Sequence, residues 1–452
     1  MGLKAVSTSP QTGQLGCSPG RSSCSHLCLT TPQGPVCACP TGEELHQDNF
    51  SCFTPQAFLI FTRRDDIKRI SIETENSREM LIPVRGVSEA SGVDYDRADG
   101  RIYWSDIKQK TISRAHSNGS SVEVMVEHGL DYPRGLALDW RAGNLYWTDA
   151  GTGRLEMISL TSGARRVLIW RQLDSPQALV LHTAAGRIIW SVWGQDPSIE
   201  AASLDGEGRE VVVASSGRAT GLTVDSAGEF LFWTDQDSDQ ISCTSLATPG
   251  RVKTVYSSGH PYALTYFQST LYWTDWDMKN IYKAGLDRTD LSTPVVLKTG
   301  VDYIMDMVVY SASQADAEEV SECSELKCEH LCVVKAGLPV CLCPSHYSLQ
   351  SDGLSCSPPP TFLLFSQKNK ISRLVMSEDK VPDIVLPIKK ARSIQSISYD
   401  QVEDMIYWVD HGRDQQPARQ VIRRSSDLGD TQVLNRLDKF LPFDLAIDPT
   451  TR

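Results

Sequence analysis

Hydrophobic residues recur along most of this chain in short runs separated by polar and turn-forming residues. Between residues 135 and 170, the runs GLALDW, NLYWTD, RLEMISL and RRVLIW are joined by the stretches RAGN, GTG and TSGA. Runs rich in β-branched and aromatic residues and bounded by Gly, Asn and Ser are typical of β-strands in antiparallel hairpins. This segment therefore predicts four short antiparallel strands.

The four-strand unit repeats with a nearly constant period. A Tyr-Trp-Thr-Asp motif, with small changes of spelling, starts at residues 103, 146, 232 and 272, and a weaker copy starts at 189. The steps between successive copies are 43, 43, 43 and 40 residues, and a further step of 43 backwards reaches Ile60 in the apolar run FLIFTRRDDIKRI. A period of about 40–45 residues with several short strands is the signature of a β-propeller blade. The sequence predicts an all-β, six-bladed propeller.

The residues of the repeated motif have predicted places in a blade. On a strand, Leu145 and Trp147 point to one face, and Tyr146 and Thr148 point to the other. Both faces can be buried, because the blades of a propeller pack face to face around a ring. We interpret the motif as packing between blades. The alternative that its Asp residues bind a metal or act as acid catalysts is less favoured, because repeated architecture already explains a repeated Asp.

The two ends of the repeat region predict how the ring closes. The run at 58–82 lacks an innermost strand before it, whereas DYIMDMVVY at 302–310 is an innermost-type strand without outer partners after it. Pairing the two would complete the sixth blade from both ends of the repeat region and remove open sheet edges. The propeller is therefore expected to span residues 57–312.

Cysteine usage adds two small modules to this picture. Twelve of the 13 cysteines form two groups of six, and one, Cys243, stands apart; the groups are Cys17, Cys24, Cys28, Cys37, Cys39 and Cys52, and Cys323, Cys328, Cys332, Cys341, Cys343 and Cys356. Both groups have the spacing of epidermal-growth-factor-like modules, which predicts disulfide frameworks at 13–55 and 320–357 and an oxidising compartment. His26 and His330 lie among these cysteines, but six evenly used cysteines favour disulfides over zinc. Neither group follows an acidic calcium-binding pattern, so no metal is expected.

The last part of the chain predicts an incomplete second propeller. The run FLLFSQKNKISRL echoes FLIFTRRDDIKRI, and Leu364 precedes Tyr407 by another 43 residues. Residues 360–452 hold about two blades, so we expect them not to fold stably alone, since about three repeats are usually needed. The start, MGLKAVSTSP, has no apolar segment typical of a signal peptide, and no run of about 18 apolar residues follows. The expectation is a piece of a longer extracellular protein, without its own signal peptide or anchor.

Charge and motif content exclude some functions. The formal net charge is −12, and no Lys/Arg run outlines a nucleic-acid footprint. An acidic chain leans weakly towards basic protein partners. The sequence has no nucleophile elbow and no His-Glu-x-x-His motif, so we predict neither an enzyme nor a cofactor.

The repeats and modules together resemble the low-density lipoprotein receptor family. Within it, HGLDYPRGLALDW, SSGRATGLTVD and TFLLFSQKNKISRL are most similar to the low-density lipoprotein receptor-related proteins five and six, the Wnt co-receptors. The resemblance covers essentially the whole chain. It implies the second growth-factor-like module, third propeller, third module and start of the fourth propeller of an endocytosed type I membrane receptor, placed on the extracellular side of the cell membrane.

The resemblance also selects one disulfide pairing, because the sequence alone permits 15 pairings in each group. It implies first-to-third, second-to-fourth and fifth-to-sixth bonds: Cys17–Cys28, Cys24–Cys37, Cys39–Cys52, Cys323–Cys332, Cys328–Cys341 and Cys343–Cys356. Two glycosylation motifs occur at Asn49 and Asn118, and Asn118 is preferred because Asn49 lies close to Cys52. Cys243 is expected to be a buried thiol rather than an intermolecular bridge.

Three functions compete: a ligand-binding part of a Wnt co-receptor, an adhesion scaffold or lipoprotein-receptor-type propeller, and an enzyme. Binding is favoured over catalysis by the absence of catalytic motifs, and the resemblance favours the first function. It implies Wnt proteins and Dickkopf-type antagonists as partners, with Frizzled in a signalling complex.

Topology predicts the binding face, because residues that open the first strand of a blade share one mouth of the ring with residues that close the second strand. These residues include aromatic and Arg side chains, which are enriched at binding hot spots; they are Glu89, Ile107, Tyr132, Arg134, Gln177, Trp193, Arg218, Asp237, His260, Tyr262, Trp276, Tyr303 and Met305. The resemblance implies the same face. The chain departs from the family's pattern at Arg134, where an acidic residue is usual, and at Gln177, where an arginine is usual. We expect Arg134 to weaken the attraction of basic antagonists.

Overall fold

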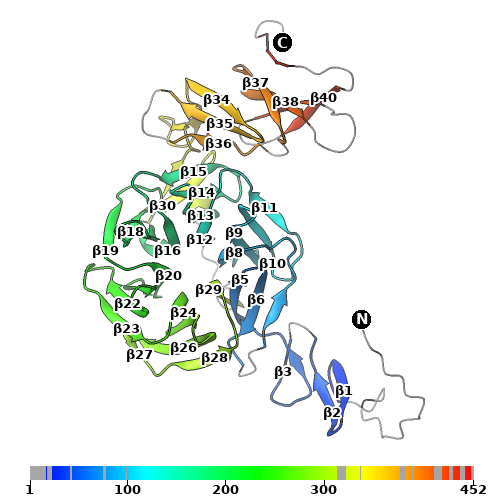
Figure 1. Cartoon of the computed structure of the whole chain (residues 1–452), viewed down its shortest axis with the longest axis vertical. Coiled ribbons are helices and arrows are strands. Elements are labelled where there is room, and N and C mark those ends of the chain that lie inside the picture. Colours follow the sequence, from blue (N-terminus) through cyan, green and yellow to red (C-terminus); the bar gives the residue numbers. More distant parts are fainter. Residues whose placement is uncertain are drawn as a thin grey trace, which may run out of the picture.

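A computed structural model shows a ring of β-sheets with smaller units at two places on its edge (Figure 1). It describes residues 17, 23–40, 43–74, 78–97, 99–225, 227–312, 322–335, 337–376, 382–388, 391–411, 420–426, 431–437 and 443–448. The described elements are almost all strands; the helical ones are the 3₁₀-helix η1 (Thr183–Ala185) and the short α-helix α1 (Glu322–Glu325). The all-β fold class predicted from the sequence is confirmed.

Six antiparallel sheets form the blades of the ring. The innermost strand of each blade comes first in the chain, and the sheet then proceeds outward by hairpins. Five blades are continuous in sequence: β8 (Ala90–Tyr95), β9 (Arg101–Asp106), β10 (Thr111–His116) and β11 (Glu123–Val126); β12 (Pro133–Asp139), β13 (Asn144–Asp149), β14 (Arg154–Ser159) and β15 (Arg165–Ile169); β16 (Pro176–His182), β17 (Arg187–Val192), β18 (Ser198–Ser203) and β19 (Glu210–Ala214); β20 (Ala219–Val224), β21 (Phe230–Asp235), β22 (Gln240–Ser245) and β23 (Lys253–Ser257); and β24 (Pro261–Phe267), β25 (Thr270–Asp275), β26 (Asn280–Asp287), β27 (Asp290–Leu291) and β28 (Val295–Thr299).

The sixth blade is assembled from segments far apart in the sequence. Strand β29 (Ile304–Ser311) pairs with β5 (Ala57–Arg63), which continues to β6 (Asp66–Ser71) and β7 (Met80–Ile82). Val308 lies opposite Ile60 in this antiparallel register. The sheet therefore has the two-segment closure that the sequence pattern predicts, and closure leaves the ring without a free innermost edge.

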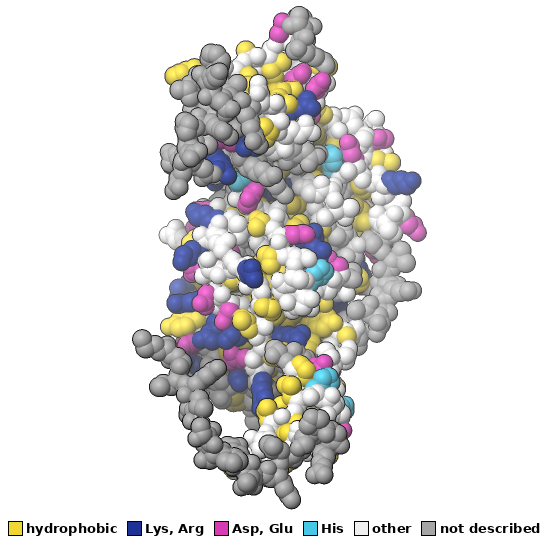
Figure 2. Space-filling model, turned by 90° about the vertical axis from the view of Figure 1, so that its right-hand side faces the viewer, with side chains coloured by type: hydrophobic (Ala, Val, Ile, Leu, Met, Phe, Trp, Pro, Cys, Tyr) yellow, Lys and Arg dark blue, Asp and Glu magenta, His cyan; other side chains and the backbone are white. Residues whose placement is uncertain are grey.

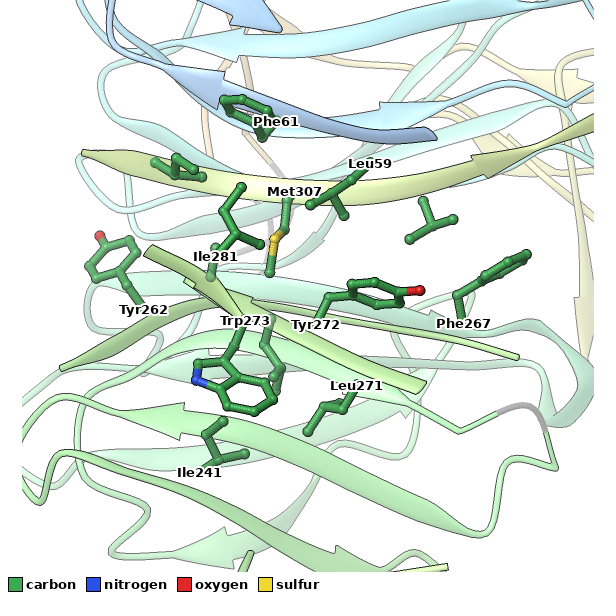
Figure 3. Packing of buried hydrophobic residues seen from close by; sticks show 14 of the residues in the cluster. Leu59, Phe61, Ile241, Tyr262, Phe267, Leu271, Tyr272, Trp273, Ile281 and Met307 are labelled. Atoms are coloured by element: carbon green, nitrogen blue, oxygen red, sulfur yellow. The ribbon is translucent and has the colours of Figure 1, made fainter. Parts of the chain in front are cut away.

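The large residues of the repeated motif fill the space between blades. Trp147, Trp190 and Trp273 are fully buried, at 0% exposure. Figure 3 shows Trp273 and Tyr272 of one blade pointing to opposite sides of β25, with Leu59 and Met307 of the closing blade on the side of Tyr272. Each blade thus buries both of its faces against neighbours, because alternate residues of a strand point in opposite directions.

A hydroxyl group in the motif joins one blade to the next at several places around the ring. The Thr148 hydroxyl accepts a hydrogen bond from the Gly135 amide at 2.9 Å and donates to the carbonyl of Gln177, on the innermost strand of the following blade. Ser105 makes the same pair of bonds, with the Gly92 amide at 2.8 Å and the Arg134 carbonyl at 3.0 Å. We call these groups hydroxyl staples. Each lies at a β-bulge near the start of an innermost strand.

The Asp of the motif holds the loops at one end of the blade. Asp149 accepts hydrogen bonds from the amides of Asp131 at 2.8 Å, Tyr132 at 2.9 Å, and Gly151 and Thr152 at 3.0 Å. These donors belong to the loop before β12 and the loop after β13. The carboxylate is buried and engaged with backbone amides, which supports an architectural role.

The two small modules contain the predicted disulfide frameworks. Their strands are β1 (Leu27–Thr31), β2 (Gly34–Ala38), β3 (Glu44–Leu45) and β4 (Cys52–Phe53), and β30 (Leu331–Lys335), β31 (Leu338–Leu342), β32 (Ser348–Leu349) and β33 (Cys356–Ser357). The disulfides join Cys17 to Cys28, Cys24 to Cys37, Cys39 to Cys52, Cys323 to Cys332, Cys328 to Cys341 and Cys343 to Cys356, which is the pairing that the resemblance implies.

The second small module packs against the propeller. Leu331 and Val333 lie in one buried cluster with Trp190 of the third sheet. Lys335 also donates hydrogen bonds to the carboxylates of Asp205 and Glu207, both at 2.6 Å. Apolar burial and charged hydrogen bonds together fix this module to the ring.

Two further sheets follow in the chain. They comprise β34 (Phe362–Gln367), β35 (Lys370–Val375) and β36 (Ile384–Val385), and β37 (Ile394–Asp400), β38 (Met405–His411), β39 (Gln420–Ser425) and β40 (Gln432–Leu437). Ile371, Ile406 and Trp408 lie in a shared buried cluster. The sheets agree with the start of a second propeller. The domain ranges 13–55, 57–312, 320–357 and 360–452 stay predictions.

Candidate ligand-binding mouth

One end of the central channel gathers the beginnings of the innermost strands and the ends of the second strands. The same backbone hydrogen bond pins this arrangement in several blades: the amide of Ile107 donates to the carbonyl of Glu89 at 3.0 Å, and the amide of Trp276 donates to that of His260 at 3.0 Å. Loops on either side of each hairpin are therefore neighbours. We call this end of the channel the mouth.

A small cavity lies at the centre of the mouth. It brings together side chains from blades that are distant in sequence, namely Arg134, Gln177, Trp193, Tyr262 and Met305, together with Asp306. Five of these six residues were predicted from topology to share one mouth. The hydroxyl staples fix their positions, since the carbonyls of Arg134, Gln177 and Tyr262 each accept a staple bond.

An aromatic cluster forms one side of the mouth. The rings of Tyr262 and Trp276 are stacked with centroids 3.7 Å apart, and Trp276 lies edge-on to Tyr303 at 5.9 Å. Trp276 also donates its indole N–H to the Ile304 carbonyl at 2.9 Å. This bond fixes the orientation of a half-buried indole. Tyr303 is 47% exposed, so the cluster presents apolar rings to the solvent.

Two basic side chains at the mouth lie beside a carboxylate. Arg218 lies 2.7 Å from Asp237, and His260 lies 2.6 Å from Asp239. Arg134 differs: its guanidinium lies over the Tyr132 ring at 5.0 Å, and its buried Nε has no hydrogen-bond partner among the described residues. The mouth therefore contains a cation, Arg134, that has no carboxylate within 4 Å among the described residues.

Two half-buried carboxyl groups line the channel below. Asp306 accepts hydrogen bonds from the amides of Val93 at 3.0 Å and Met307 at 2.9 Å, and burial raises its pKa to about 7. Asp94 accepts from Leu138 at 2.7 Å in the next blade, and burial raises its pKa to about 6. Both groups connect neighbouring blades, as the hydroxyl staples do.

Some predicted mouth residues are buried and cannot offer their side chains to a ligand. Ile107 is 5% exposed and Gln177 is 6% exposed. The Gln177 amide donates to the Ser175 hydroxyl at 3.0 Å, so it supports the adjoining loop. Tyr262 is also only 6% exposed, and its loss would leave a large cavity. Trp276 is consequently the better residue for testing binding.

The remaining predicted residues lie around this centre. Glu89 is half-buried, with its amide bonded to Asp106 at 3.2 Å, and Tyr132 is 43% exposed. Sequence reasoning missed Arg64, whose guanidinium lies 4.3 Å from the Tyr303 ring centroid. It also missed Asp239, the partner of His260. Topology could have indicated both, because they adjoin strand ends at the mouth.

Other sequence motifs give no second site. His26, Glu43 and Cys52 cluster, as do Glu329, His330 and Cys356, but both cysteine sulfurs are held in disulfides. Thiolate coordination is therefore excluded at these two clusters. The asparagines of the two glycosylation motifs, Asn49 and Asn118, are both exposed.

The free Cys243 is 1% exposed, and burial raises the pKa of its thiol to about 11.

The side of the molecule in Figure 2 carries acidic and basic side chains interspersed with small apolar patches.

The fold is a closed propeller with disulfide-bonded growth-factor-like modules before and after it in the chain. Residues 100–140 and 143–183 match the low-density lipoprotein receptor repeat class B. Over its whole length the chain is 47% identical to low-density lipoprotein receptor-related protein 5 of Homo sapiens, and it spans 28% of that protein. It is 39% identical to low-density lipoprotein receptor-related protein 4 of Homo sapiens, over 87% of this chain and 21% of that protein. The resemblance to the low-density lipoprotein receptor-related proteins is confirmed.

One solved structure supports the fold alone. The crystal structure of a nidogen/laminin complex aligns with a TM-score of 0.52 at 24% identity, covering 57% of this chain and 99% of that chain. Within the residues that the structure describes, no helix has the length and apolar character needed to cross a membrane.

Proposed function

We propose that this chain is a ligand-binding region of a receptor of the Wnt co-receptor type and is not an enzyme. Its ligands are Wnt proteins and Dickkopf-type antagonists, which bind at the mouth, and Frizzled joins the signalling complex. The 47% identity to low-density lipoprotein receptor-related protein 5 supports this assignment. The observation that carries the proposal is the partly exposed aromatic cluster around Trp276, because such rings are enriched at binding hot spots.

The test compares two tryptophans at opposite ends of the channel. Immobilised full chain is titrated with purified Wnt proteins and Dickkopf-type antagonists, and the Trp276→Ala variant should lose about 2 kcal/mol, or roughly 30-fold, in affinity. The matched control is Trp140→Ala, because Trp140 directly follows the end of β12 that faces away from the mouth. Thermal unfolding checks that both variants are folded. Equal binding by wild type and the folded Trp276→Ala variant would exclude the mouth as the site.

A further inference from the structure

Arg134 is a basic side chain at the mouth that has no acidic partner among the described residues. It lines the central cavity, and its Nε is buried without a hydrogen-bond partner among the described residues. Two other basic residues near the mouth have acidic partners: Lys110 pairs with Asp131, and Arg63 lies 2.6 Å from Asp302. Arg64, like Arg134, lies over an aromatic ring instead. A partly buried guanidinium without a carboxylate has lost hydration without gaining a counter-charge, which is unfavourable.

The carboxyl group in the same cavity does not supply this charge. Asp306 lines the cavity, but its two oxygens accept bonds from the amides of Val93 and Met307. Burial raises the pKa of Asp306 to about 7, so this carboxyl group is only partly ionised near neutral pH. Asp306 therefore belongs to the connection between blades, and Arg134 retains its capacity for an external anion.

The surroundings of Arg134 indicate the kind of anion. Tyr132 lies beneath the guanidinium at 5.0 Å, and the Arg134 charge acts on the Tyr262 hydroxyl across the channel. The Tyr262 ring in turn stacks on Trp276 at 3.7 Å. The Arg134 side chain is hydrogen-bonded to the Tyr262 hydroxyl, but a guanidinium has five N–H donors and can bind a carboxylate with two others. The adjoining rings suit an apolar neighbour of that carboxylate.

We propose that the mouth selects a ligand segment that places an Asp or Glu carboxylate on Arg134 and an adjacent apolar side chain on the rings of Trp276 and Tyr303. The inference rests on the proposed function, because it assumes that the mouth binds protein ligands. A ligand of any net charge meets the requirement if the segment entering the channel carries a carboxylate. A segment that presents Lys or Arg there is rejected by like-charge repulsion.

The experiment selects ligands without assuming their identity. A random cyclic-peptide library displayed on phage is selected against the full chain at physiological salt. Peptides whose binding is lost with Trp276→Ala are classed as mouth-directed. The inference expects an Asp or Glu beside an apolar residue in these peptides. Changing that residue to Asn or Gln should weaken binding at least about tenfold, the effect of losing a hydrogen bond to a charged group.

Variants of the chain complete the test. Arg134→Gln should weaken the same peptides at least about tenfold and should add no further loss to the neutralised peptide. Arg141→Gln is the matched control, because Arg141 follows the opposite end of β12, over the Trp140 ring. Mouth-directed peptides that lack Asp and Glu, or that bind Arg134→Gln as tightly as wild type, would overturn this inference alone. A selection without any Trp276-dependent peptide would overturn the proposed function and this inference together.

Discussion

Removal of one hydroxyl staple tests whether the repeated motif holds the blades together. Thr148 is fully buried, and its hydroxyl accepts from the Gly135 amide at 2.9 Å and donates to the Gln177 carbonyl. Substitution by Val keeps the shape of the side chain and replaces the hydroxyl by a methyl group. Two buried backbone groups, one in each of two neighbouring blades, then lose their partner.

The structure sets the magnitude of the expected effect. An unsatisfied buried donor or acceptor costs about 1–3 kcal/mol, so the two groups together cost about 2–6 kcal/mol. Burial of the extra methyl group returns about 1 kcal/mol. Thr148→Val should therefore lower the free energy of unfolding of the propeller by about 1–5 kcal/mol, which is a substantial part of the stability of a typical domain.

Urea unfolding followed by tryptophan fluorescence measures this change, because the motif tryptophans are buried in the folded ring. The matched control is Thr161→Val at an exposed turn between β14 and β15, which should change stability by less than about 0.5 kcal/mol. If Thr148→Val unfolds at the same urea concentration as this control, the hydroxyl staple does not stabilise the contact between blades.

Two further outcomes follow from buried titratable groups. Burial raises the pKa of Asp306 to about 7 in the folded chain, above about 3.9 when unfolded, so the folded state binds the extra proton. The stabilisation from this extra proton is present at low pH and is lost as the pH rises to about 7. The free energy of unfolding of Asp306→Asn should not fall over this pH range. A difference in stability between wild type and Asp306→Asn that is the same at pH 5 and pH 8 would contradict this prediction. Burial raises the pKa of the Cys243 thiol to about 11, so in the native chain this thiol should resist alkylation by iodoacetamide at pH 8. The thiol should react once the chain is unfolded in urea. Rapid labelling of the native chain would disprove this prediction.

The architecture was predictable because the repeat carries it. A period of about 43 residues fixes the number of blades, and strands without partners at both ends of the repeat fix the closure. The first repeat shows how far this reasoning extends. Its motif has degenerated around Ile60, yet Thr62 keeps the staple, accepting from the Asp306 amide at 3.2 Å and donating to the Ser91 carbonyl at 2.7 Å. The 43-residue register aligns Thr62 with Ser105 and Thr148, and the structure shows that Thr62 makes the same pair of bonds.

The sequence predicted which residues lie at the mouth, but it did not predict their exposure or their hydrogen-bond partners. Strand order places Arg134, Gln177 and Tyr262 at one end of the ring, but strand order says nothing about exposure. Gln177 and Tyr262 are 6% exposed, because loops and neighbouring rings cover them. The pairing of His260 with Asp239 joins residues of two blades, at 2.6 Å, through loop conformations that no periodic pattern specifies.

The staples suggest why such a mouth can change its ligands while the ring stays closed. They bond to the main-chain carbonyls of Arg134 and Gln177, and any residue type at these positions supplies the same carbonyl. The side chains of Arg134 and Gln177 take no part in the staple bonds, and a change at Arg134 alters the charge of the channel without removing a staple bond. The stability of the propeller and its choice of ligand thus depend on different atoms of the same residues, which allows the two properties to be tested by separate substitutions.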